Sequence, residues 1–138
     1  MGDLQSFKAA TVLAGGVAKR GETCGALLGA LMALGLAAGR ERMEDTERYR
    51  QAMEPAQRIS QRFQEELQTQ FETSLSGDTT LCRDIQAAIY GRSFNMNNPE
   101  DYHAFLESGG HSAEGCPKVC AVAAQVAAEE IIRLEEGT

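Results

Sequence analysis

Apolar side chains recur every three or four residues along most of this chain, which is the period of an amphipathic helix. The longest such pattern runs over residues 45–74, where Glu, Arg and Gln occupy the other positions. Its predicted inner stripe consists of Tyr49, Met53, Ala56, Ile59, Phe63, Leu67 and Phe71. Pro55 lies inside this helix and is expected to kink it or to begin its second half. We expect the charged residues to form a solvated face.

A second helix is predicted over residues 23–39, a stretch of 17 residues without a charged side chain. A membrane span needs about 20 apolar residues, and glycines dilute this one, so we expect a helix buried among other helices. Gly25, Gly29 and Ala33 recur every four residues. That spacing lines one face with small side chains, which predicts a packing seam where another helix approaches closely.

Shorter helices complete the pattern. A weak helical period over residues 4–12 ends at the Gly15-Gly16 pair. A helix over residues 81–89 is expected to end at Gly91, and another is expected to begin at Asn98-Pro99, as cap and first residue, and to run to Glu107. The last helix is predicted over residues 117–135. The predicted inner face of the helix over residues 81–89 consists of Leu81, Cys82, Ile85, Ala88 and Ile89. That of the last helix consists of Cys120, Ala123, Ala124, Ala127, Ile131 and Leu134.

Composition agrees with a helical protein. The chain has 138 residues, of which 6% are aromatic, with no Trp and 3 Pro, while Ala and Leu dominate. Helix-forming residues therefore outnumber those that strands prefer. The predicted fold class is all-α: a single domain over residues 1–138, built as a bundle of about five to six helices.

The net charge and the N-terminal residues bear on which partners and which location the protein is expected to have. With 20 acidic and 13 basic residues the net charge is -7, so most of the surface would repel nucleic acid, and no nucleic-acid partner is expected. The first twenty residues show no basic segment followed by an apolar run and a cleavage site. We expect a cytoplasmic protein without a membrane span.

Four cysteines carry the candidate chemistry, and three of them are predicted at helix starts. Cys24 opens the glycine-rich helix, Cys82 opens the next short helix, and Cys116 directly precedes Pro117. Unpaired backbone N–H groups at a helix start favour a thiolate, and Arg83 and Lys118 would add positive charge. Cys120 lies four residues after Cys116, so the two share a helix face.

Clustered thiols support three chemistries: ligation of an iron–sulfur cluster or another thiophilic metal, dithiol–disulfide exchange, or a structural zinc site. Zinc is disfavoured because only one close cysteine pair exists. A disulfide within one helix would be strained, so Cys24 or Cys82 is a better partner for Cys116 or Cys120. Each cysteine is also open to the simpler interpretation of a small buried side chain, above all Cys82 and Cys120. His103 and His111 could complete a metal site or carry protons, although surface positions are expected for both.

The segment GETCGALLGALMALGL at residues 21–36 resembles the signature of the redox-active C_GCAxxG_C_C family, whose hallmark is CGAxxG. The resemblance extends upstream to Gly15-Gly16 and downstream to Cys82 and to Cys116-Pro117-Lys118. It implies a small helical redox-active protein, and a similar domain in split-Soret cytochrome c has been suggested to hold an iron–sulfur cluster. Many members carry a further cysteine ahead of the Gly-Gly turn, but no cysteine precedes Cys24 here. Cys120 is therefore the candidate substitute, on helical geometry alone.

The preferred hypothesis is a redox protein in which Cys24, Cys82, Cys116 and Cys120 converge on one pocket. They would ligate an iron–sulfur centre or another thiophilic metal, or cycle between thiols and a disulfide, in electron transfer or redox sensing with a redox partner protein. The alternative is a non-catalytic helical module that associates with itself, as a homo-oligomer, or with a partner, its cysteines merely buried. A third hypothesis is a membrane-associated subunit that inserts residues 23–39.

Overall fold

The computed structural model describes residues 3–137, which form six α-helices and one 3-10 turn. The helices are α1 (Leu4–Ala10), α2 (Gly25–Ala38), α3 (Thr46–Gln70), α4 (Cys82–Tyr90), α5 (Pro99–Glu107) and α6 (Cys116–Glu135), and the turn η1 (Thr11–Leu13) follows α1. Within the described residues the β pairing consists of a single isolated bridge between Thr23 and Leu81. The predicted all-α fold class is confirmed.

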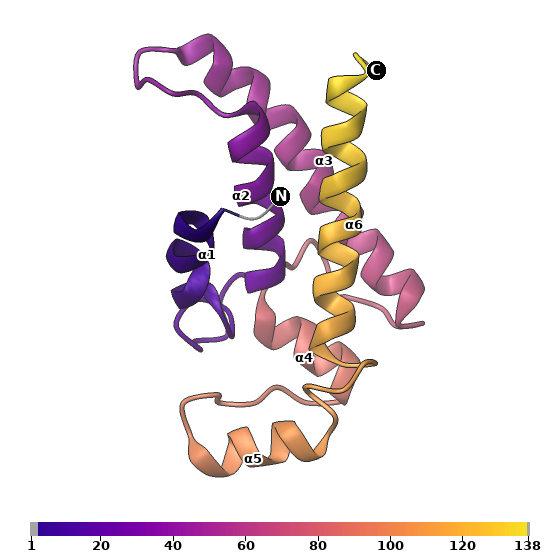
Figure 1. The fold of residues 1–138 in the computed structure, drawn as a ribbon. Coiled ribbons are helices and arrows are strands. Elements are labelled where there is room, and N and C mark those ends of the chain that lie inside the picture. Colours follow the sequence, from indigo (N-terminus) through magenta and orange to yellow (C-terminus); the bar gives the residue numbers. More distant parts are fainter. Residues whose placement is uncertain (1–2, 138) are drawn as a thin grey trace.

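The core lies between α2, α3 and α6, which pack on one another in pairs (Figure 1). Figure 1 also shows α1 beside α2, and α4 and α5 across the end of the bundle where α2 and α6 begin. The buried apolar residues of the core include Leu27, Ala30, Leu34, Ile59, Phe63, Leu67, Ile85, Val119, Val122 and Val126. A second, smaller cluster of Phe94, Met96 and Phe105 packs α5 against the end of α4. The starts of three helices therefore meet where the two clusters adjoin.

The inner stripe of α3 follows the prediction only in its second half. Ile59, Phe63 and Leu67 are buried as expected. Before them the buried positions are Ala52 and Pro55, whereas Tyr49 is 45% and Met53 40% exposed. The Tyr49 ring instead contacts the Arg40 guanidinium, 4.8 Å from the ring centroid, which holds it at the surface.

The inner face of α6 is also rotated from the predicted one. Ala123 and Ala127 are buried as expected, but the main contributions come from Val119, Val122 and Val126. Cys120 and Ala124 are exposed instead. The reason is area, since a valine side chain removes more apolar surface from water than alanine or cysteine, so the helix turns its valines inward.

The small residues of α2 do not form the predicted seam. Leu27, Ala30 and Leu34 are its buried residues, while a Cβ added at Gly29 would meet no atom within 4 Å. Gly25 is the exception, because a Cβ there would lie 2.6 Å from the Leu13 carbonyl oxygen. Its neighbour is therefore the turn after α1 and not a helix. Among the helices of residues 3–137, none combines the length and hydropathy needed to cross a membrane.

The charged face of α3 is not simply solvated, because two of its arginines pair with α6. Arg58 Nη2 lies 2.7 Å from Glu130 Oε1, and Arg62 pairs with Glu129. Glu130 is only 2% exposed and also pairs with Arg133 of its own helix, at 2.7 Å. The amphipathic pattern gave no sign of this buried carboxylate.

Candidate functional site

A cavity of about 330 Å³ lies at the end of the bundle where α2, α4 and α6 begin. All four cysteines line it, together with the polar residues Gln86 and His111 and with small or apolar residues: Ala10, Leu13, Ala14, Gly15, Gly16, Gly25, Ala26, Met96, Phe105 and Val119. A wider hollow of about 640 Å³ along α3 is lined mostly by polar side chains, four of them glutamines, and by no thiol among the described residues. The thiol cavity is therefore the candidate functional site.

Three of the thiols lie where the sequence predicted, at helix starts. Cys24 is the residue that caps α2, Cys82 is the first residue of α4, and Cys116 is the first residue of α6. Cys24 and Cys82 are buried and Cys116 is half-buried. All four thiols are free. The structure thus brings together the four cysteines that the sequence singled out.

A short backbone clasp, formed by residues 21–24 and 80–83, joins two of these helix starts. The amide of Cys24 donates to the Thr80 carbonyl at 2.9 Å, and the amide of Cys82 donates to the Glu22 carbonyl at 2.6 Å. These bonds flank the antiparallel bridge between Thr23 and Leu81. Side chains alternate along paired segments, so Cys24 and Cys82 both point to the face opposite Thr23 and Leu81. That shared face is the one toward the cavity.

The left-handed turn, residues 15–19, contributes Gly15 and Gly16 to the wall of the cavity. Its five residues all have positive φ, from Gly15 at 66° to Lys19 at 61°, with Val17 at 58° among them. A Cβ added at Gly16 would lie 2.6 Å from Cys82 Cβ, so only glycine lets this turn approach the cysteine. The Gly-Gly turn was predicted. Its continuation through three residues that rarely adopt this conformation was not.

Cys116 is held by a tyrosine. The Tyr90 hydroxyl donates to Cys116 Sγ at 3.4 Å, and its ring packs edge-on against Phe94 and Phe105 at centroid distances of 5.9 and 5.7 Å. The aromatic cluster therefore fixes the position of this hydroxyl. The sequence reasoning missed Tyr90, and the signal that could have found it is its position eight residues after Cys82 on the same helix face.

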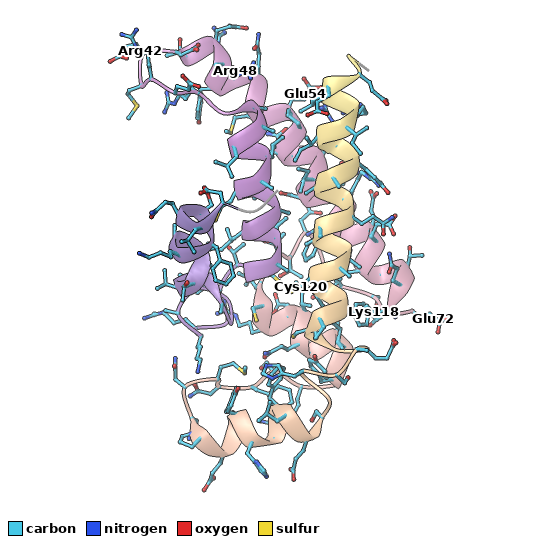
Figure 2. The ribbon with its side chains drawn as sticks, in the orientation of Figure 1. Arg42, Arg48, Glu54, Glu72, Lys118 and Cys120 are labelled. Carbon is cyan, nitrogen blue, oxygen red and sulfur yellow. The ribbon has the colours of Figure 1, made fainter. Side chains whose placement is uncertain are left out.

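Cys120 lies at the mouth of the cavity. Figure 2 shows it on the side of α6 near α2, with Lys118 labelled on the other side of that helix. It also borders a shallow apolar groove between α2 and α6, to which Gly29, Ala33 and Ala124 contribute. Cys120 is exposed and also lines the cavity, so the cavity opens to the surface beside this thiol.

The expectation that helix starts favour thiolates is wrong for this site. Burial raises the pKa of Cys24, and the nearby backbone N–H groups of Leu27 and Ala26 offset only part of that rise. Burial, with repulsion from Cys24 and Cys116, raises the pKa of Cys82 to about 12. Burial likewise raises the pKa of Cys116 and of Cys120. The loss of water around the sulfurs outweighs the helix dipoles.

The expected positive charges also lie elsewhere. Lys118 Nζ is 3.1 Å from Glu114 and lies over the Phe71 ring, 4.8 Å from its centroid. Arg83 is exposed and does not line the cavity. The cavity wall carries no Lys or Arg within residues 3–137.

The two histidines separate clearly. His111 lines the rim of the cavity, and its ring packs edge-on against Phe105 at 5.5 Å. His103 lies on the outer side of α5, where Nε2 is 3.3 Å from Glu107. Both histidines have the exposed positions that were expected, but only His111 also lines the cavity and could meet a group bound by the thiols.

The arrangement does not form a closed site for one ion. In the described part of the chain, no group of three or more His, Cys, Asp or Glu side chains is placed to hold a metal ion. The thiols surround a cavity instead of meeting at a point. Sulfur is nevertheless the donor that iron–sulfur clusters and thiophilic metals require, so Cys24, Cys82, Cys116 and Cys120 are the residues that could hold such a group.

Comparison with known families identifies the family to which the chain belongs. Residues 2–130 match the family described as "Putative redox-active protein (C_GCAxxG_C_C)". The chain belongs to the C_GCAxxG_C_C family. Cys24, Cys82, Cys116 and Cys120 all lie within the matched residues. Neither the curated proteins nor the solved structures gave a match.

Proposed function

We propose that this C_GCAxxG_C_C protein is an electron-transfer or redox-sensing protein whose four cysteines hold an iron–sulfur or other thiophilic metal centre in the cavity. The observation that carries the proposal is the convergence of Cys24, Cys82, Cys116 and Cys120 on one 330 Å³ space. These residues come from three helices far apart in the sequence. A redox partner protein would exchange electrons with the centre.

Two properties of the cavity favour a metal centre over dithiol exchange. Thiol exchange needs a thiolate, and burial raises the pKa of all four thiols, so little thiolate forms near neutral pH. A metal centre supplies the positive charge that the cavity wall lacks, and thiols that ligate a metal give up their protons. In this proposal the thiols act as ligands, and the chain's other groups exclude water and position the sulfurs.

The test is anaerobic purification followed by assays of iron and labile sulfide per chain and by visible absorption. We expect both elements in the wild-type protein and their loss in Cys24→Ser, Cys82→Ser and Cys116→Ser. His103→Gln is the matched control, because His103 lies outside the cavity. Wild-type protein without iron would contradict the iron–sulfur centre, wild-type protein without any bound metal would contradict the metal centre altogether, and serine variants that keep the metal would contradict its place in the cavity.

The same experiment separates the dithiol alternative. A protein without metal that loses two thiols per chain on mild oxidation, and regains them on reduction, would be a dithiol–disulfide protein. If all four thiols stay unchanged under both treatments, the cysteines are only buried side chains, as in the interaction-module alternative.

A further inference from the structure

Helix α4 carries a row of three polar side chains toward the thiols. Cys82, Gln86 and Tyr90 follow one another at four-residue intervals, so they lie on one helix face. Cys82 and Gln86 line the cavity, and Tyr90 reaches Cys116 at the start of α6. One helix therefore supplies a thiol and two further groups to the site.

Gln86 is buried but keeps a free hydrogen-bond donor. Gln86 is 3% exposed, and its Oε1 accepts a hydrogen bond from the Phe94 amide at 3.0 Å. Its amide nitrogen has no hydrogen-bond partner in the part of the chain that the structure describes, and it is not sealed inside the protein. Since Gln86 lines the cavity, this N–H group is the donor that Gln86 can offer to a group held there.

Tyr90 supplies the second donor. Its hydroxyl lies 3.4 Å from Cys116 Sγ and 3.5 Å from the Gly110 carbonyl oxygen. The second distance is long for an oxygen acceptor, whereas the first is normal for the larger sulfur atom, so sulfur is the better-placed acceptor. A thiolate would accept this bond more strongly than a thiol does, because it carries a full negative charge.

We propose that Gln86 and Tyr90 are positioning residues that donate hydrogen bonds to the sulfur atoms of a centre held in the cavity and thereby raise its reduction potential. The inference rests on the proposed function. Hydrogen bonds to sulfur set the potential of sulfur-ligated iron, because they stabilise the state with more negative charge, which is the reduced one. They matter here because the cavity wall offers no Lys or Arg among the described residues to do the same.

The experiment compares the midpoint potential, iron content and labile sulfide of three variants with those of the wild-type protein. Tyr90→Phe removes the hydroxyl and keeps the ring that packs on Phe94 and Phe105. Gln86→Glu keeps an oxygen for the Phe94 amide but replaces the free donor by a second oxygen. Tyr102→Phe is the control, since that ring also packs on Phe105 but its hydroxyl does not contact a thiol.

We expect Tyr90→Phe to keep its iron and sulfide and to show a more negative midpoint potential, and Gln86→Glu to show a larger negative shift. Tyr102→Phe should match the wild-type protein. Equal potentials in all four proteins, each with its iron, would overturn this inference alone. If Tyr90→Phe lost its iron, Gln86→Glu would test the inference: a more negative midpoint potential would support it, and the wild-type potential would overturn it. Wild-type protein without iron and sulfide would overturn the proposed function and this inference with it.

Discussion

At the scale of single residues, sequence reasoning found the thiols but not the groups around them. Cysteines are few in this chain and the CGAxxG pattern is recognisable in the sequence, so Cys24, Cys82 and Cys116 could be identified directly. Gln86, Tyr90 and Glu130 could not, because their roles depend on partners from other helices. The thiol pKa values were predicted in the wrong direction because burial, which only the fold sets, outweighs the local helix dipole.

Glu130 gives a prediction at this scale. Burial would raise the pKa of Glu130, but hydrogen bonds from Arg133 and Arg58 hold it below its ordinary value of 4.5. A lowered folded-state pKa stabilises the fold above about pH 4.5, and this contribution is lost as the pH falls through the folded-state value. We expect Glu130→Gln to lower the free energy of unfolding by about 1–3 kcal/mol at pH 7.

Urea unfolding at several pH values checks this expectation. The difference between the wild-type protein and Glu130→Gln should shrink as the pH falls from 5 toward 3, because the wild-type carboxylate is then neutralised too. The control is Glu54→Gln, an exposed partner of the same arginine, which should cost less than about 1 kcal/mol. A difference between wild type and Glu130→Gln that does not depend on pH would contradict the role of the ionised carboxylate.

At the scale of helices and turns, existence and length were predictable and the inward faces were less so. The 3.6-residue period and the cap residues set the helix positions, as for Asn98, which caps α5, and Gly91, which ends α4 with a φ of 79°. The inward face of α6 was wrong because alanines on both sides leave the period ambiguous, and packing then selects the valines. The left-handed turn, residues 15–19, has no signal beyond its two glycines.

The left-handed turn leads to a prediction of stabilisation. Ala18 is exposed with a φ of 52°, a conformation that costs an L-residue roughly 1–2 kcal/mol and glycine almost nothing. We expect Ala18→Gly to raise the free energy of unfolding by about 1 kcal/mol. Ala121→Gly, at an exposed position in α6, should lower it by about 1 kcal/mol. Chemical unfolding that shows the same loss for both variants would rule out the strained turn.

The open face of α2 gives a second prediction for an element. Because a Cβ at Gly29 would meet nothing within 4 Å, Gly29→Ala should gain about 0.5–1 kcal/mol of stability from better helix propensity. Gly25→Ala should lose about 1–3 kcal/mol, because its Cβ would meet the Leu13 carbonyl oxygen. Thermal unfolding of the two variants checks both signs. A loss of stability in Gly29→Ala would contradict the open face and support the packing seam predicted from the sequence.

At the scale of the whole molecule, the order of elements fixed the all-α architecture, but the cavity depended on tertiary contacts. Its walls include residues of α1, η1, the left-handed turn, α2, α4, α5 and α6, so no local pattern contains it. Sequence reasoning could place three thiols at helix starts. It could not show that these starts meet at one end of the bundle, which follows from the packing of α2, α3 and α6 and from the backbone clasp.

A guest held by thiols from three helices should stabilise the entire fold. A group that binds only the folded state adds about 2.7 kcal/mol when present at 100 times its dissociation constant. We therefore expect protein that contains iron and sulfide to unfold at a higher temperature than the same protein after anaerobic chelation. Cys116→Ser should abolish that difference, and His103→Gln should keep it. Equal unfolding temperatures with and without the metal would place the metal outside the cavity.

The backbone clasp has an evolutionary consequence. Its bonds run between main-chain amides and carbonyls, from Cys24 to Thr80 and from Cys82 to Glu22. Mutation of the side chains at Thr23 and Leu81 leaves those groups in place, so descendants of this protein are free to vary both positions while their sulfur atoms keep the same spacing. A third such bond runs from the Arg83 amide to the Gly21 carbonyl, and only proline, which lacks the amide hydrogen, is barred by the backbone itself from the donor positions 24, 82 and 83.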